Sequence, residues 1–172
     1  MGETLAIRIV AATDADLGPV AELAGVIWRR HYPGIITPGQ IEYMLARGYS
    51  HDALERFLVE PGAGLLLAYD ANRLIGFAAY YRPDEVDELK LDKLYVHEDY
   101  HGRGVGSRLI AGVEESGRGQ GCSTLTLQVN KHNAKAIRAY ERNGFAVRKS
   151  VVVDIGGGYL MDDYVMAKRL AR

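Results

Sequence analysis

The sequence predicts an α/β fold in which helices cover a mixed β-sheet. Apolar segments of strand length recur along the chain, segments of helical period lie between them, and Gly, Pro, Asn and Asp turns separate the two kinds. The chain has 172 residues, of which 48% are hydrophobic and 25% are charged. These proportions are typical of soluble globular proteins and disfavour disordered and fibrous classes. We therefore expect a single domain over residues 1–172 with about four to five helices.

The N-terminal part is predicted to contain one strand followed by helices. Residues 5–10, LAIRIV, alternate as a half-buried strand does. Thr13 and Asp14 then offer N-cap oxygens to an amphipathic helix that ends before Pro33. Residues 31–60 hold two further short helices, the first opening at a proline. This segment is therefore predicted to be a helical insertion.

The rest of the chain alternates strands with two helices. The turn Asp70-Ala71-Asn72 joins the first two of these strands in a predicted hairpin. The predicted strands cover residues 64–69, 73–81, 88–96, 124–129, 145–154 and 159–168, and the predicted helices cover residues 104–116 and 133–142.

Charge and targeting signals exclude several classes of function. The formal net charge is −1 and basic residues are scattered, which disfavours a nucleic-acid partner. The chain has one cysteine, Cys122, so no intrachain disulfide forms and a reduced, cytoplasmic location is expected. Its beginning has no basic segment followed by an apolar one, and no apolar run approaches the ~18 residues of a membrane span. We expect neither secretion nor a membrane partner.

The most informative segment is residues 94–109, LYVHEDYHGRGVGSRL. An apolar strand leads into Gly102, Gly104 and Gly106, and a helix follows. Glycines permit positive φ, and the unpaired N–H groups of a helix start carry partial positive charge, so an anion is the natural occupant. The nucleoside-triphosphate loop is excluded because no Lys-Ser or Lys-Thr follows, and the spacing fits a dinucleotide fingerprint poorly. The turn alone is equally typical of a plain strand-to-helix connection.

This segment resembles motif A of the GNAT N-acetyltransferases, Gln/Arg-x-x-Gly-x-Gly/Ala, with His101 in the first position. Residues 129–145 resemble motif B of the same family. The positions that match it are Asn133, Ala136, Tyr140, Gly144 and Phe145. Together the resemblance covers about residues 64–170, with the cofactor motifs within residues 88–145.

The resemblance implies a twisted, mostly antiparallel sheet whose central parallel strands, 88–96 and 124–130, splay apart. It also implies acetyl-CoA as cosubstrate, with its pyrophosphate on the backbone amides of the turn at residues 101–106, hereafter the glycine turn. Backbone groups freed where the strands diverge would bond the pantetheine amides. The residues expected to contact CoA are Leu94, Tyr95, Val96, His101, Gly102, Arg103, Gly104, Val105, Gly106, Ser107, Asn133 and Tyr140.

The resemblance also implies catalytic roles. In the family an amine attacks the thioester directly and a tyrosine protonates the departing thiolate, and Tyr140 occupies that position. Some relatives place a glutamate base where this chain has Lys90. Asp92 or Glu88 is therefore a candidate base, acting directly or through water, and an ordinary surface carboxylate is the alternative. Strand alternation predicts one shared face for Glu88, Lys90, Asp92, Leu94 and Val96.

Recognition of the acceptor amine is expected from segments beside the opening between the two splayed strands. The candidates are Trp28, His31, Tyr32, Tyr159, Met161, Asp162 and Asp163. The two adjacent acidic residues suit a cationic amine, and a solvated turn after the glycine triplet 156–158 is the alternative. The histidines lack metal-ligand grouping, so no metal is expected.

The leading hypothesis is acetyl transfer to a primary amine of a small molecule, a polyamine or a peptide. A non-catalytic acyl-CoA-binding or sensing module is the alternative, because Lys90 replaces the glutamate of some relatives. A plain nucleotide binder is a third. The aromatic residues within 28–49 are compatible with a substrate pocket or with a homodimer interface.

Overall fold

The computed structural model describes residues 6–83 and 87–171, and within them seven strands form one sheet. The strand order is β1-β2-β3-β4-β5-β7-β6, and every neighbouring pair is antiparallel except β4 and β5. The strands are β1 (Ile7–Ala11), β2 (Gly64–Asp70), β3 (Arg73–Tyr81), β4 (Glu88–Val96), β5 (Thr124–Asn130), β6 (Ala146–Gly156) and β7 (Tyr159–Arg169).

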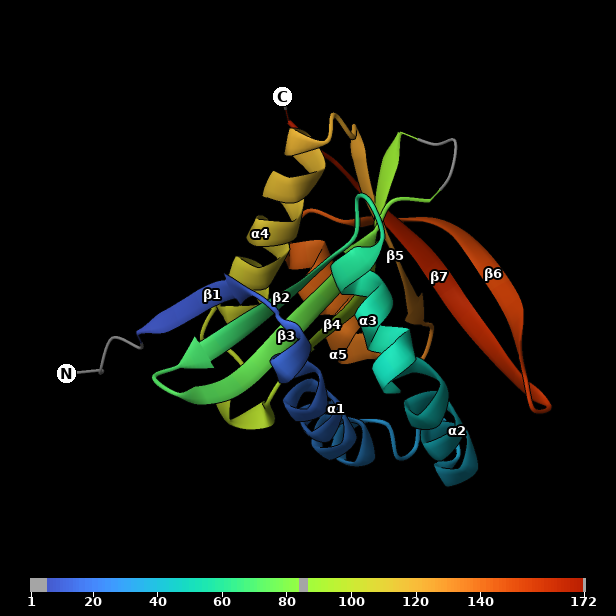
Figure 1. Cartoon of the computed structure of the whole chain (residues 1–172). Coiled ribbons are helices and arrows are strands. Elements are labelled where there is room, and N and C mark those ends of the chain that lie inside the picture. Colours follow the sequence, from blue (N-terminus) through green and yellow to red (C-terminus); the bar gives the residue numbers. More distant parts are fainter. Residues whose placement is uncertain (1–5, 84–86, 172) are drawn as a thin grey trace.

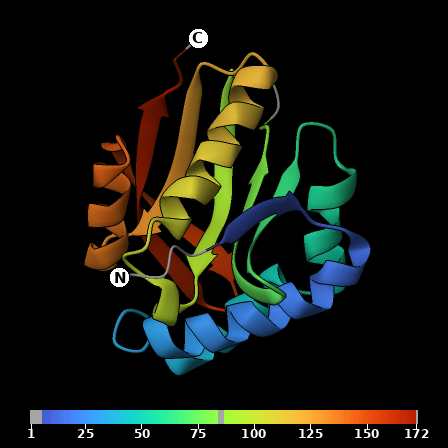
Figure 2. The same cartoon turned by 90° about the vertical axis from the view of Figure 1, so that its left-hand side faces the viewer.

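Five α-helices cover the two faces of this sheet (Figures 1 and 2). They are α1 (Leu17–His31), α2 (Pro38–Gly48), α3 (His51–Val59), α4 (Val105–Gly119) and α5 (Ala134–Arg142). Helices α4 and α5 pack on one face, and α1, α2 and α3 pack on the other. Short 3-10 turns, η1 (Asp14–Asp16) and η2 (Glu98–Tyr100), precede α1 and the glycine turn. The predicted mixed α/β fold is confirmed.

Side chains cap the starts of two helices. Thr37 Oγ1 accepts a hydrogen bond from the Gln40 amide at 3.2 Å, next to the proline that opens α2. The Asn133 side chain caps α5 in the same way, 3.3 Å from the Ala136 amide. Thr13 and Asp14 were predicted to cap α1, but Thr13 is the N-cap of η1, Asp14 lies within η1, and the N-cap of α1 is Asp16. Helix α1 therefore begins later than predicted, and it ends before Pro33 as predicted. The predicted strand start at residue 5 lies outside the described residues.

Each face of the sheet has its own hydrophobic core. On one face Leu109 and Val113 of α4 pack against Leu89 of β4 and Leu125 of β5, and all four side chains are fully buried. On the other face Phe77 of β3 packs among residues of α1, α2 and α3. The sheet therefore separates two interiors that meet where the sheet is interrupted.

A β-bulge at Asp92 overturns the predicted alternation of β4. Tyr80 of β3 pairs with Leu91 and Ala79 pairs with Lys93, so Asp92 is an extra residue between them. Leu91 and Leu94 consequently share the α4 face of the sheet. The prediction that Glu88, Lys90, Asp92, Leu94 and Val96 lie on one face is wrong, because the extra residue reverses the parity of every later side chain.

The parallel pairing of β4 with β5 stops part of the way along both strands. It runs from Glu88 opposite Thr124 to Leu91 opposite Leu127. Beyond this point β4 continues to Val96 and β5 to Asn130 without pairing to each other. The splayed central strand pair is therefore present, and it opens the sheet between its two faces.

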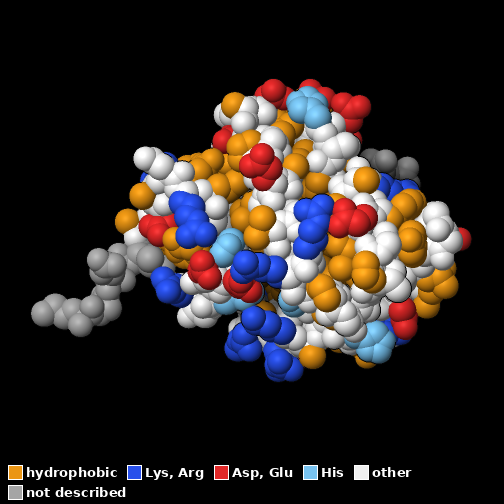
Figure 3. All heavy atoms as spheres, turned by 90° about the horizontal axis from the view of Figure 1, so that it is seen from below, with side chains coloured by type: hydrophobic (Ala, Val, Ile, Leu, Met, Phe, Trp, Pro, Cys, Tyr) orange, Lys and Arg blue, Asp and Glu red, His pale blue; other side chains and the backbone are white. Residues whose placement is uncertain are grey.

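The surface seen from below carries interspersed charges. On this face, which includes α1 and α2, basic and acidic side chains lie next to one another among hydrophobic ones (Figure 3). In the part of the chain that the structure describes, no helix combines the length and apolarity required to cross a bilayer.

Truncation of the α4 core tests this packing. Leu109 is 0% exposed, so Leu109→Ala is expected to lower the free energy of unfolding by about 2–5 kcal/mol. Leu160 on β7 is 59% exposed, and the matched change Leu160→Ala is expected to stay within about 0.5 kcal/mol of wild type. Urea denaturation followed by circular dichroism measures both, and equal losses would contradict the assigned core.

Candidate active site

A cavity of about 930 Å³ lies where β4 and β5 part. Its lining includes Ile110 and Tyr140 from the α4 and α5 face, and Trp28 and Tyr32 from the α1 face. It therefore reaches both interiors of the molecule. Its volume lies in the upper part of the range usual for small-molecule sites.

All residues predicted to contact CoA line this cavity except Arg103. The Arg103 guanidinium instead lies 5.5 Å from the centre of the Tyr100 ring. The structure thus brings the two halves of the predicted cofactor site together, although their contacts with CoA remain predictions.

The glycine turn presents backbone N–H groups to this cavity. Gly102 and Gly104 have φ of +74° and +77°, in the left-handed region that favours glycine. A Cβ added at either would meet nothing within 4 Å, so the backbone here faces open space. Gly104 is the N-cap of α4 and supplies no side-chain cap, which leaves the first N–H groups of the helix available to an anion.

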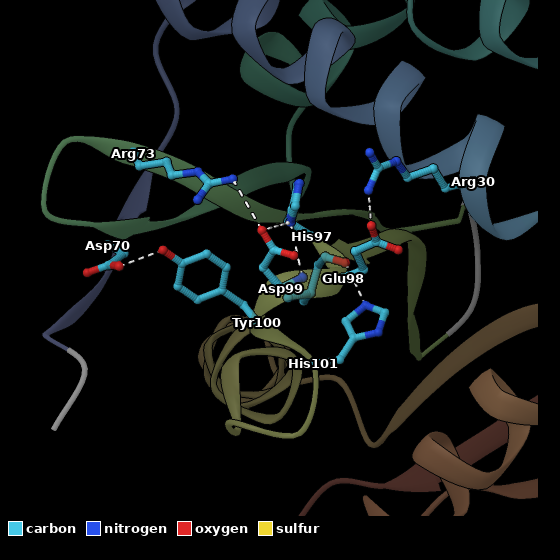
Figure 4. A network of polar contacts seen from close by, with 9 residues as sticks. Arg30, Asp70, Arg73, His97, Glu98, Asp99, Tyr100 and His101 are labelled. Atoms are coloured by element: carbon cyan, nitrogen blue, oxygen red, sulfur yellow. Dashed lines mark hydrogen bonds and ion pairs between the residues drawn. The ribbon is translucent and has the colours of Figure 1, made fainter. Parts of the chain in front are cut away.

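A polar network holds η2 and the glycine turn against the rest of the fold (Figure 4). The Tyr100 hydroxyl donates to Asp70 Oδ2 at 2.6 Å. Arg73 lies 3.9 Å from Asp99, and Arg30 of α1 pairs with Glu98. The β2–β3 hairpin and α1 therefore both fix the position of the turn.

His101 contacts both β4 and α5 across the opening between β4 and β5. Its Nε2 lies 2.7 Å from the Val96 carbonyl oxygen, and Lys135 Nζ of α5 lies 2.8 Å from its Nδ1. Nε2 therefore donates to the carbonyl, while Nδ1 accepts from the ammonium. The side chain that replaces the Gln or Arg of motif A thus links β4 to α5.

Tyr140 lies on α5 and faces the cavity from the same side. Its ring packs 5.8 Å from the ring of Phe145. Burial raises the pKa of the Tyr140 phenol above its usual value, with a smaller contribution from Tyr32. The phenol is therefore fully protonated at neutral pH.

The opposite end of the cavity is walled by Trp28, Tyr32, Tyr49 and Tyr95, hereafter the aromatic wall. The Trp28 ring lies 4.3 Å from Tyr32 and 5.6 Å from Tyr95, centre to centre. The Tyr32 and Tyr95 hydroxyls lie 3.0 Å apart. Because Trp28, Tyr32 and Tyr49 are buried within this chain, they do not supply the exposed surface that a homodimer interface would need.

The end of α1 is joined to α5 at the boundary between the two ends of the cavity. His31 Nε2 lies 3.0 Å from Oδ1 of Asn133, the residue that caps α5. Trp28, His31 and Tyr32 thus reach the cavity, as an acceptor-side position requires.

Three cavity residues have buried polar atoms without a hydrogen-bond partner among the described residues. These atoms are Trp28 Nε1, the Tyr49 hydroxyl oxygen and Asp163 Oδ1. Buried polar groups are nearly always bonded, and Asp163, the charged member of the three, is the one for which a partner matters most.

The acidic pair in β7 divides between two environments. Asp163 is 5% exposed and lines the cavity, as Met161 does. Burial raises the pKa of Asp163 to about 6, the Asp162 charge adds to the shift, and Lys90 and Lys131 oppose it. Asp162 points away and forms an ion pair with Lys131 at 2.8 Å. Strand alternation accounts for the division.

Tyr159 and Asp162 do not line the cavity. The Tyr159 ring packs 5.1 Å from the Tyr43 ring, at the α2 contact with the last hairpin. Their acceptor roles stay predictions that this placement does not support.

Tyr49 lines the cavity but was not predicted from the sequence. It lies eight residues after Ile41 and four after Leu45, so the helical spacing of the buried face of α2 could have identified it.

Of the two candidate bases on β4, only Asp92 lines the cavity. Asp92 lines the cavity, but its side chain is 27% exposed and accepts from Lys93 Nζ at 3.0 Å. Glu88 lies outside the cavity and is paired with Arg148 at 2.6 Å. The Lys90 ammonium donates to Gln128 Oε1 at 2.9 Å.

One surface group has the composition of a metal site. Ligand atoms of Asp14, His51 and Glu55 lie within 4.8 Å of one another, away from the cavity. The His51 imidazole already pairs with Asp14 at 2.8 Å. The prediction that the protein needs no metal stays a prediction.

Comparison with known proteins identifies the family. Residues 20–145 match the sequence profile of the Acetyltransferase (GNAT) family. An uncharacterized N-acetyltransferase of Mycobacterium bovis is 30% identical over 161 residues, which cover 92% of this chain and 99% of that protein. A spermidine N(1)-acetyltransferase of Thermoplasma acidophilum is 26% identical over 169 residues, covering 96% and 98%.

The fold comparison agrees. The crystal structure of PaiA N-acetyltransferase from Thermoplasma acidophilum, in complex with coenzyme A, has a TM-score of 0.82 and 25% identity, and the match covers 96% of this chain and 99% of that one. The cavity, the glycine turn and these relatives lead to one conclusion: the chain belongs to the GNAT family and is an N-acetyltransferase.

Proposed function

We propose that this enzyme transfers the acetyl group of acetyl-CoA to a primary amine of a small molecule, a polyamine or a peptide by direct attack. The observation that carries the proposal is the cavity that joins the two faces of the sheet. The glycine turn and Tyr140 lie at one end, and the aromatic wall lies at the other. Two substrates can therefore meet from opposite sides.

The cofactor end suits the chemistry of CoA. The glycine turn offers unpaired N–H groups to a diphosphate, and its Cβ positions are open. The β4 segment from Leu94 to Val96 has no strand partner on the β5 side, so its free backbone groups suit pantetheine amides. Lys135 adds a positive charge beside the turn.

The acceptor end suits an amine. A spermidine N(1)-acetyltransferase is among the relatives, which supports a polyamine as one acceptor. In direct attack the amine nitrogen bonds to the thioester carbonyl carbon, and the carbon–sulfur bond then breaks. Tyr140 supplies the proton that the leaving thiolate requires. The burial that raises the pKa of this phenol also raises the basicity of a thiolate beside it, so donor and acceptor stay matched.

Removal of the phenol hydroxyl tests the proton donor. Tyr140→Phe keeps the ring and is expected to lower kcat about 10²–10⁴-fold, measured as free thiol released from acetyl-CoA with a panel of amines including spermidine. Tyr164→Phe on β7 is the matched control, because Tyr164 is half-buried and does not line the cavity. Wild-type rates in Tyr140→Phe would exclude this role. CoA binding without turnover on any amine would favour the non-catalytic module.

A second substitution tests the cofactor end. Gly104→Val places a branched side chain at φ +77° in the open space of the turn, and is expected to abolish CoA binding. Gly121→Val is the matched control, since Gly121 has φ +76°, equally open surroundings and no place in the cavity lining. Each substitution should cost about 1–3 kcal/mol of stability through backbone strain.

Thermal-shift measurements separate the two variants. CoA at about 100 times its Kd should stabilise wild type and Gly121→Val by about 2.7 kcal/mol, and should leave Gly104→Val unchanged. CoA binding to a folded Gly104→Val would contradict the placement. Stabilisation by ATP or NAD as large as that by CoA would support the plain nucleotide binder.

A further inference from the structure

We propose that Asp163 binds the ammonium group of the acceptor and takes its proton before the nitrogen attacks. This inference rests on the proposed function and names the chemical class of the acceptor, a cationic alkylamine. It also assigns the base that the sequence left open between Asp92, Glu88 and water.

The first observation is a buried carboxylate without a partner. Asp163 is 5% exposed, lines the cavity, and has no hydrogen bond to Oδ1 among the described residues. Burial of a carboxylate without a partner is costly, which is why such groups are normally paired or hydrogen-bonded. A cationic ligand in the cavity would supply the missing partner.

The second observation is that the nearby cations are engaged elsewhere. Lys131, which follows β5, pairs with Asp162 at 2.8 Å. Lys90 of β4 donates to Gln128 at 2.9 Å. The Asp162 charge raises the pKa of Asp163, and the Asp163 charge in turn raises the pKa of the Tyr32 phenol at the end of α1. These contacts leave the negative charge of Asp163 directed at the cavity.

The third observation is the aromatic wall on the same side of the sheet. Alkylammonium groups bind favourably to the faces of Trp and Tyr rings, and a carboxylate beside such rings completes a site for them. Trp28 and Tyr32 are both buried and line the cavity together with Asp163. This combination favours a cationic aliphatic amine over a neutral or an anionic acceptor.

Tyr32 connects Asp163 to the proton donor. Burial raises the pKa of the Tyr32 phenol, and the Asp163 charge adds to the rise. The pKa of Tyr140 is raised mainly by burial and further by Tyr32. Tyr32 therefore lies near both Asp163 and Tyr140, and all three side chains line the same cavity.

The protons balance in this scheme. The ammonium gives one proton to the Asp163 carboxylate, and the neutral amine then attacks the thioester carbonyl carbon. As the carbon–sulfur bond breaks, Tyr140 protonates the sulfur. The nitrogen of the new amide loses its second proton to the Tyr140 phenolate, which becomes a phenol again. The proton on Asp163 leaves to solvent, so one proton is released for each acetyl group transferred.

Asp92 is less suited to this role. Its carboxylate is partly exposed and already accepts from Lys93 at 3.0 Å. Asp163 has no such partner at Oδ1, and burial raises its pKa to about 6.

Asp163→Asn tests the inference, and Asp92→Asn tests the competing candidate base. Asp52→Asn is the matched control, because the Asp52 side chain is fully exposed on α3. With spermidine as acceptor, kcat/KM of Asp163→Asn should fall about 10²–10³-fold. The wild-type profile of kcat/KM should decline on the acidic side with an apparent pKa near 6, and this limb should be absent from Asp163→Asn. Asp52→Asn should retain both rate and profile.

Stability supplies a readout independent of turnover. Folding raises the pKa of Asp163 from about 3.9 to about 6, so the ionised carboxylate lowers the stability of the folded protein. This loss of stability is complete above about pH 6 and absent below about pH 3.9. Asp163→Asn should therefore raise the Tm at about pH 8, and this gain should shrink as the pH falls. A lower Tm at about pH 8 would show a paired structural carboxylate and overturn the inference.

Ligand-induced shifts complete the test. Spermidine should raise the Tm of wild type but not of Asp163→Asn, while CoA should raise both. If Asp163→Asn does not fold, Asp163→Ser serves in its place. Full activity and an unchanged acidic limb in Asp163→Asn, or their loss in Asp92→Asn alone, would overturn the role of Asp163. Absence of turnover by wild type with any amine would instead refute the proposed function.

Discussion

The early end of pairing between β4 and β5 is the constraint on which the rest of the structure depends. Backbone N–H and C=O groups inside a sheet are normally paired, so two strands separate only where a cavity or a ligand satisfies them. The bulge at Asp92 immediately follows Leu91, the last residue of β4 that pairs with β5. Because a bulge bends its strand and increases its twist, this extra residue accounts for the divergence.

The cavity between β4 and β5 is lined by different groups on the two faces of the sheet. On the α4 face, the glycine turn and Tyr140 of α5 line the part of the cavity where we propose that CoA binds. On the α1 face, the aromatic wall and the buried Asp163 line the cavity, and here we propose that the cationic amine binds. The His31–Asn133 contact joins α1 to the cap of α5, so the two ends are fixed relative to each other.

Sequence reasoning recovered what periodicity and turn chemistry encode. The strand bounds 73–81 and 88–96 agree with the structure, as does the predicted start of β2 at residue 64. The bulge was missed although the alternation of residues 88–91, ELKL, breaks at the adjacent polar residues Asp92 and Lys93. A single break of this kind does not by itself distinguish a bulge from an ordinary exposed strand residue. Asp162 and Asp163 were predicted together, because which of the two side chains faces the cavity is set by the register of β7 against β5 and β6, which is a tertiary property.

The placement of the lysines around Asp163 argues for a functional role. Pairing Asp163 with Lys90 or Lys131 would relieve the cost of a buried charge, yet one lysine bonds Gln128 and the other bonds Asp162. The Asp163 carboxylate is therefore buried without a bonded cation, although Lys90 and Lys131 lie near enough to lower its pKa. Such local cost is typical of binding and catalytic sites, where a group held ready for a ligand is more useful than a satisfied one.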